Sequence, residues 1–166
     1  MEEFELRNSG WLRQVKAGQG VYIHPSVNAY ECTIGDNSQV GAFVELQNGV
    51  NIGNNCKISS HSFLCEGVTL QDGVFVGHGV MFTNDRWPRA TGPDGKKLGR
   101  DGWKCLPTLV GRRVSIGSGC TILPGIEIGE EAMIGAGSVV TKSVPARHVV
   151  FGNPARVIRP LTENEL

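Results

Sequence analysis

The chain has 166 residues, 40% of them hydrophobic, and its 16 basic and 16 acidic side chains cancel. This length suits one domain, and a balanced charge provides no overall field to attract nucleic acid or an anionic membrane. The sequence has no apolar run of the ~20 residues that cross a bilayer and shows no signal peptide, so we expect a cytoplasmic protein. Its five cysteines form no CxxC pair, which favours reduced structural thiols over disulfides or metal ligands.

The first 20 residues are weakly patterned and are expected to form a short cap or an extended lead-in, with residues 23–27 as a first coil that is set one residue out of phase with Ile34. Beyond them, a branched aliphatic residue or Phe recurs at every sixth position, and a mostly smaller residue follows four positions later. The first series is Ile34, Val40, Leu46, Ile52, Ile58, Leu64, Leu70, Val76, Phe82, Val110, Ile116, Ile122, Ile128, Ile134 and Val140. The second is Ser38, Val44, Val50, Cys56, Ser62, Val68, Val74, Val80, Val114, Cys120, Ile126, Ala132, Ser138 and Val144.

A period of six matches neither an α-helix nor a simple alternating strand, and it predicts an all-β fold, a parallel β-helix of hexapeptide repeats. Each hexad supplies a short flat strand and a corner, and three hexads close one triangular coil. Successive coils stack at the ~4.8 Å spacing of strands in a sheet. One coil cannot bury its own inner face, so stability is expected to grow by stacking.

Residues 1–166 are thus expected to form one domain, with repeats at about 22–87 and 110–145 and a short C-terminal tail at 146–166. The repeats are interrupted by an excursion loop at residues 88–109, which is rich in Gly, Pro, Lys and Arg. A loop of this length in a compact solenoid is usually functional, and such insertions tend to lie over the binding face.

Residues 18 apart are expected to stack on one corner of the prism. One column is Asn48, Glu66 and Asn84, and the excursion begins just after it; Glu is a poor turn residue, which favours a functional column. A second column, Asp36, Asn54 and Asp72, has no loop over it and is interpreted as turn chemistry.

The histidines offer little sign of a metal site. Three zinc-binding histidines at suitable spacing are missing, although His78 is reminiscent of gamma-class carbonic anhydrases, which share this fold; no metal is expected. His61 could line a sugar site near Glu66 or be a plain corner residue.

The chain resembles the left-handed β-helix acyltransferases that use acetyl-CoA. The resemblance rests on the repeats, on residues 134–140 (IGAGSVV) and on residues 150–157 (VFGNPARV). Residues 64–70 (LCEGVTL) and 80–89 (VMFTNDRWPR) are similar, more narrowly, to nucleotide-sugar 3-N-acetyltransferases. The resemblance implies a left-handed coil and an acetyl-CoA-dependent enzyme that acetylates the 3-amino group of a nucleotide-linked amino sugar for polysaccharide biosynthesis. It also implies a homotrimer with its sites between subunits.

The same resemblance suggests roles for individual residues. Asn84 matches the family residue that hydrogen-bonds the amine, and Glu66 matches a position near the sugar, where it binds the sugar or, as a minority view, acts as general base. Substrate contacts are expected from Asn48, His61, Asp85, Trp87 and Arg89, with Trp103 on the loop as a further stacking candidate. Acetyl-CoA contacts are expected from Gly117, Ser118, Ala136, Gly137, Lys142, Arg156 and Arg159.

Direct transfer is expected, with no acyl-enzyme, because a neutral amine can attack the thioester itself once both reactants are held in place. Two alternatives stay open. An O-acetyltransferase acting on a sugar or antibiotic hydroxyl would need a histidine base, and a non-enzymatic or metal-site β-helix would not need the small residues near 117 and 136.

Overall fold

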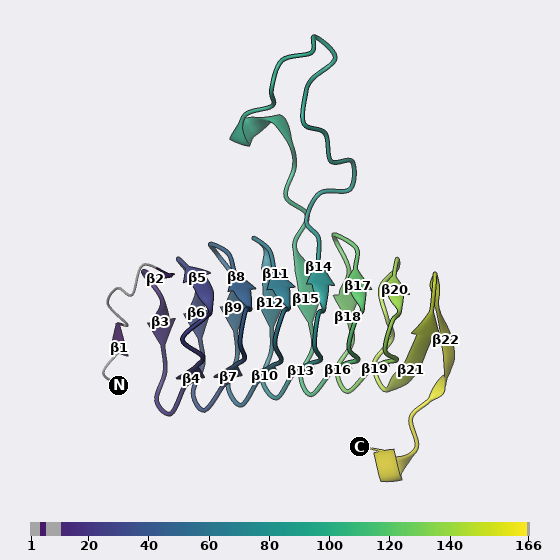
Figure 1. Ribbon diagram of the computed structural model, residues 1–166. Helices are drawn as coiled ribbons and strands as arrows, with labels where there is room; N and C mark the ends of the chain where they lie inside the picture. Colours follow the sequence, from purple (N-terminus) through teal and green to yellow (C-terminus); the bar gives the residue numbers. More distant parts are fainter. Residues whose placement is uncertain (1–3, 6–10, 166) are drawn as a thin grey trace.

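In the computed structural model, which describes residues 4–5 and 11–165, the chain winds into a three-sided prism (Figure 1). The described residues form three sheets, here named A, C and B in the order in which each complete coil passes through them. Apart from β1 and β22, neighbouring strands pair in parallel, each with the equivalent strand of the next coil. This confirms the parallel β-helix expected from the six-residue period.

The strands are short, mostly of two residues. Sheet A contains β1 (Phe4–Glu5), β3 (Lys16–Ala17), β6 (Thr33–Ile34), β9 (Asn51–Ile52), β12 (Val68–Leu70), β15 (Thr108–Val110) and β18 (Glu127–Ile128). Sheet C contains β4 (Tyr22–Ile23), β7 (Gln39–Val40), β10 (Lys57–Ile58), β13 (Phe75–Val76), β16 (Ser115–Ile116), β19 (Met133–Ile134), β21 (His148–Gly152) and β22 (Ala155–Pro160). Sheet B contains β2 (Leu12–Arg13), β5 (Asn28–Tyr30), β8 (Glu45–Leu46), β11 (Phe63–Leu64), β14 (Met81–Phe82), β17 (Thr121–Ile122) and β20 (Val139–Val140).

Both predicted inward series are buried along their whole length. Where the second series is polar, its side chains bond to the corners. The hydroxyl of Ser38 donates to the carbonyl of Gly53 (2.8 Å) and accepts the N–H of Cys56 (2.9 Å). The thiol of Cys120 donates to the carbonyl of Gly135 (3.2 Å). Small hydroxyls and thiols thus satisfy corner groups that a buried turn would otherwise leave without a partner.

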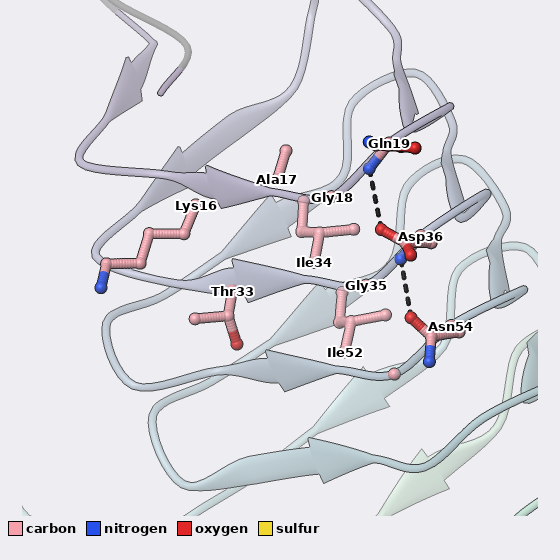
Figure 2. A pocket seen from close by; sticks show the side chains of 11 residues that line it. Lys16, Ala17, Gly18, Gln19, Thr33, Ile34, Gly35, Asp36, Ile52 and Asn54 are labelled. Carbon is pink, nitrogen blue, oxygen red and sulfur yellow. Dashed lines mark hydrogen bonds between the residues drawn. The ribbon is translucent and has the colours of Figure 1, made fainter. Parts of the chain in front are cut away.

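The A–C corner is held by a ladder of side-chain oxygens (Figure 2). Oδ1 of Asp36 accepts the N–H of Gln19 (2.8 Å), and Oδ1 of Asn54 accepts that of Asp36 (2.8 Å). On the next coil, outside this view, Oδ1 of Asp72 accepts the N–H of Asn54 (2.7 Å). The structural interpretation of this column is confirmed. Each side chain bonds the backbone of the preceding coil, however, rather than its own.

The solenoid begins earlier than expected. Val15 and Ala17 are buried, and β3 already belongs to sheet A. Ala17 pairs with Ile34, 17 positions on, whereas Ile34 pairs with Ile52, 18 positions on. The first coil is therefore one residue shorter, which confirms the expected one-residue offset of residues 23–27 and extends it back to Ala17.

The excursion spans residues 83–107, between the last residue of β14 and the first of β15, so it starts earlier than the expected 88 and ends before 109. It projects away from the prism and contains the 3-10 turn η1 (Arg100–Gly102) (Figure 1). The tail adds the antiparallel hairpin β21–β22 to sheet C and ends in η2 (Glu163–Glu165). In the part of the chain that is described, no helix is long and apolar enough to cross a membrane.

Candidate functional site

The B–A corner brings together the three polar side chains of the predicted column. Asn48, Glu66 and Asn84 lie on consecutive coils and are all half-buried. The N–H of Glu66 donates to Oε1 of Gln47 (3.4 Å), and the side-chain amide of Asn84 donates to the carbonyl oxygen of Glu66 (3.1 Å). The excursion leaves the prism at this corner, as the sequence suggested.

Asn84 keeps one side-chain acceptor unused. Its Nδ2 is engaged by Glu66, and its backbone carbonyl accepts the N–H of Leu106 (2.9 Å). Among the described residues, no hydrogen bond is made to its Oδ1. Asn84 also lines a cavity of about 480 Å³. An amide oxygen held in this way can accept an N–H from a bound molecule.

The excursion supplies the other walls of this cavity, which combine a carboxylate, a guanidinium and an aromatic ring. The lining residues include Asp85, Arg89, Leu98, Gly99 and Trp103. Oδ1 of Asp85 accepts the N–H of Trp87 (2.9 Å), a local turn of the kind Asp favours. Trp87 is 79% exposed and does not line the cavity, whereas Trp103 does.

The C–B corner, at the other edge of sheet B, carries the small residues expected to contact acetyl-CoA. A Cβ on Gly117 would lie 2.5 Å from the backbone nitrogen of Ala136, so only glycine fits there. Gly137 has φ +70°, and no described heavy atom lies within 4 Å of the place its Cβ would take. We name Gly117, Ser118, Ala136 and Gly137 the small-residue wall. Its open surface would let an extended chain approach the backbone.

His61 and His78 also belong to the C–B corner. The ring of His61 packs against Phe43, with centroids 5.0 Å apart. Nδ1 of His78 lies 2.9 Å from Oγ of Ser60. Strand β11 separates His61 from Glu66, so within one chain the structure does not bring these two together. No three His, Cys, Asp or Glu side chains are grouped to hold a metal ion in the described residues.

The three basic candidates occupy different places. Lys142 is exposed on the B–A corner, two coils beyond Asn84. Arg156 pairs with Phe151, whose ring lies over Gly135, which places Arg156 near the small-residue wall.

Arg159 is already engaged by the tail. Its guanidinium forms two 2.7 Å hydrogen bonds with the carboxylate of Glu165. This pairing raises the pKa of Arg159 and, with bonds from Thr162, holds the pKa of Glu165 well below its usual range. A phosphate would have to compete with that carboxylate for Arg159.

A second cavity, also of about 480 Å³, lies over sheet A beside the A–C corner (Figure 2). Lys16, Thr33, Gly35, Asp36 and Asn54 are among its lining residues. An oxygen of Asp36 and one of Asn54 are occupied by the corner ladder. None of the site residues expected from the sequence lines this cavity.

Comparison with known proteins gives matches over most of the chain. The family model "Bacterial transferase hexapeptide (six repeats)" matches residues 31–65 and 107–142. The galactoside O-acetyltransferase of Escherichia coli is 34% identical over 137 residues, which cover 80% of this chain and 66% of that protein. A solved galactoside acetyltransferase in complex with coenzyme A is 27% identical with a TM-score of 0.58, covering 92% of this chain and 68% of that one.

The chain belongs to the hexapeptide-repeat acyltransferase family. A variant of AntD, an N-acyltransferase from Bacillus cereus, was solved in complex with dTDP and coenzyme A. It shares the fold with a TM-score of 0.77 at 24% identity, covering 89% of this chain and 84% of that one. The matches span 31%, 66% and 45% of the length of three curated relatives, so this chain covers less than two thirds of each.

For this hexapeptide-repeat acyltransferase, sequence reasoning missed the residues that shape the cavity from inside the excursion. Leu98 and Gly99 line it, and Cys105 and Leu106 join the end of the excursion to the B–A corner. These contacts lie outside the repeat, so no periodic signal could have revealed them. Apart from Arg156 and Arg159, which lie on β22 of sheet C, the predicted residues fall into two groups, one at each edge of sheet B.

Proposed function

We propose that this protein is an acetyl-CoA-dependent N-acetyltransferase that acetylates the 3-amino group of a nucleotide-linked amino sugar. The observation that carries the proposal is the state of the Asn84 side chain. Its amide nitrogen is held by Glu66, while its oxygen is left as an acceptor in a residue that lines the excursion cavity. A carbonyl acceptor suits an amine, which has N–H groups to donate.

In the proposed reaction the sugar amine must first be neutral, and partial desolvation in the cavity would lower the pKa of its ammonium form. One N–H then donates to Oδ1 of Asn84, which turns the nitrogen lone pair toward the thioester carbon. Attack forms the C–N bond and the C–S bond breaks. The departing thiolate takes the amine proton, so the protein need not supply a base.

The rate enhancement would come chiefly from holding two reactants in attack geometry, which can contribute several kcal/mol. On this proposal Glu66 and Asn48 bind sugar hydroxyls, Arg89 meets the diphosphate, and Trp103 stacks on a ring of the substrate. The small-residue wall takes the pantetheine arm of acetyl-CoA, with Arg156 nearby for a phosphate. This arrangement fits a donor bound largely by backbone groups.

We further propose that the active unit is a cyclic homotrimer. Within one chain, the small-residue wall and Asn84 lie on different corners, at opposite edges of sheet B. A ring in which the C–B corner of one copy meets the B–A corner of the next would unite them and would also bring Lys142 to the acetyl-CoA side. Such a contact is heterologous and closes by rotation.

The decisive experiment measures thiol release from acetyl-CoA with UDP- and dTDP-linked 3-amino sugars, beside their 3-hydroxy analogues. Transfer to the amines alone is expected. Asn84→Ala should lower turnover more than tenfold, the loss expected for a group that orients the attacking atom. It should leave the rise in Tm caused by coenzyme A intact. Unchanged turnover of Asn84→Ala would reject its role.

One observation favours a second candidate, an O-acetyltransferase acting on a sugar hydroxyl. Nδ1 of His78 is held by Ser60, which leaves the other ring nitrogen as a potential base at the C–B corner. The 34% identity to a galactoside O-acetyltransferase points the same way. No histidine lies in the excursion or on the B–A corner, so a base would have to come from a neighbouring copy. Transfer to a 3-hydroxy analogue that is abolished by His78→Ala would establish this reading.

A further inference from the structure

The two ends of the excursion meet at a single oxygen atom. The carbonyl oxygen of Glu66 accepts the side-chain amide of Asn84 at 3.1 Å and the thiol of Cys105 at 3.4 Å. A carbonyl oxygen has two lone pairs, so both donors can be accepted together. The residue that enters the excursion and a residue that ends it are therefore tied to the same point on the corner.

Further contacts hold the two ends of the excursion, which we call its neck, close together around this atom. The N–H of Leu106 donates to the carbonyl of Asn84 (2.9 Å), and the N–H of Thr108 donates to the carbonyl of Gly67 (3.1 Å). A Cβ on Gly67 would lie 3.0 Å from Sγ of Cys105, so the thiol rests directly on the corner backbone. A methyl group at that position would be crowded against the thiol and would require it to shift.

We propose that Cys105 is a positioning residue for the acceptor site, whose thiol fixes the excursion cavity relative to the Asn84 side chain. Trp103, which lines the cavity, lies two residues before Cys105, so a shift of the thiol would move this wall of the cavity against Asn84. The kinetic consequence rests on the proposed function. The structural consequence, that the thiol holds the neck closed, does not depend on the proposed function.

The thiol acts here as a hydrogen-bond donor and not as a nucleophile. Burial, with a contribution from the charge of Glu66, raises the pKa of Cys105. The neighbouring Cys65 has its pKa raised to about 12 by burial. A protonated thiol can donate to the Glu66 carbonyl, whereas a thiolate could not. The raised pKa of Cys105 thus favours the protonated thiol that its hydrogen bond to the Glu66 carbonyl requires.

The first test compares Cys105→Ala with Cys105→Ser. Losing one net hydrogen bond should raise the KM for the amino sugar about fivefold in the alanine variant, with the KM for acetyl-CoA changed less than twofold. Serine should restore most of the sugar KM because its hydroxyl can donate to the same carbonyl. The matched control is Cys56→Ala, which removes a similar thiol–carbonyl bond to Gln71 (3.2 Å) at the A–C corner and should leave both KM values unchanged.

A second test uses the glycine beneath the thiol. Gly67→Ala should raise the sugar KM by pushing on Cys105, whereas Gly49→Ala, at the same corner position one coil earlier, should not. Both glycines have positive φ, but no described atom lies within 4 Å of a Cβ on Gly49. Adding Cys105→Ala to Gly67→Ala should cost little more than the larger single change, because both act on one contact. Full additivity would overturn the proposal.

Hydrogen exchange tests whether the Cys105 thiol holds the neck closed, independently of the proposed function. Amides of residues 85–104 should exchange faster in Cys105→Ala than in wild type or Cys56→Ala, with no substrate present. Unchanged exchange, or an equal rise in both KM values, would reject the positioning role of Cys105. If wild-type protein transfers acetyl to no amino sugar, the proposed function fails, while exchange still decides whether the thiol holds the neck.

Discussion

Thr108 pairs with Val68 in sheet A, and its hydroxyl is buried without a hydrogen-bond partner among the described residues. The side chain points into the prism at a position that Val50, Val68, Ile126 and Val144 fill on other coils, and it is only 2% exposed. A buried hydroxyl without a partner is destabilising because its bonds to water are not replaced.

Thr108→Val should therefore raise the free energy of unfolding by about 1 kcal/mol, since it removes the unsatisfied group and keeps the shape. Denaturant unfolding would measure the change. Thr69→Val is the control, because Thr69 lies on the partner strand and faces outward, and it should shift stability by less than about 0.5 kcal/mol. A loss of stability in Thr108→Val would show that the hydroxyl has a partner in solution.

The buried cysteines and serines of the second inward series should be interchangeable. The thiol of Cys56 donates to the carbonyl of Gln71 (3.2 Å), as the hydroxyl of Ser62 does to that of Gly77 (2.9 Å) on the next coil. Burial raises the pKa of Cys56, so the thiol remains a donor.

Cys56→Ser should therefore stay within about 0.5 kcal/mol of wild type, while Cys56→Ala should lose about 1 kcal/mol through the missing bond and the small cavity. Thermal unfolding of the three proteins would compare them. Equal losses in both variants would mean that the thiol contributes packing and not a hydrogen bond.

Much of this architecture follows from the period of six, because each hexad buries the same two positions. Ile34 or Ile116 could be assigned inward without a structure, and the Asn48, Glu66 and Asn84 column followed from the spacing of 18. The handedness of the coil did not follow from the period and came from resemblance to known acyltransferases. Val15 and Ala17 were not recognised as part of the solenoid, because the shorter first coil puts them out of phase with the later hexads.

The candidate site was only partly predictable, for two physical reasons. Contacts between the excursion and the prism, such as that of Cys105 with Glu66, join residues 39 apart, and no repeat fixes the position of Cys105. The second reason is that the period assigns each residue to a corner but does not say which corners combine into one site. One of the two interpretations of His61 placed it near Glu66, yet within one chain the two residues lie on different corners.

The tail offers a test that depends on pH. The guanidinium of Arg159 holds the pKa of Glu165 well below its usual value of about 4.3. A carboxyl whose folded pKa is lowered adds stability above its unfolded pKa, and that contribution is lost as pH falls through the folded pKa. NMR titration should therefore place the Glu165 midpoint far below the usual value in wild type. Arg159→Gln should move it back toward that value, and an ordinary midpoint in wild type would contradict the pairing.

The small-residue wall can be tested with glycines that share the same backbone strain. Gly137 at the C–B corner and Gly49 at the B–A corner have φ of +70° and +74°, and a Cβ on either would have no described atom within 4 Å. Alanine at either position should cost about 1 kcal/mol of stability, because an L-residue is disfavoured there.

Only Gly137→Ala should also weaken the binding of acetyl-CoA, because its methyl group would lie where the proposed pantetheine arm approaches the backbone. We expect its KM for acetyl-CoA to rise more than about fivefold, the equivalent of roughly 1 kcal/mol of lost contact. The KM for the amino sugar should hold, and Gly49→Ala should keep both values. Calorimetric titration with coenzyme A gives the same comparison without turnover. If the two variants bind coenzyme A equally well, the donor does not run along this corner.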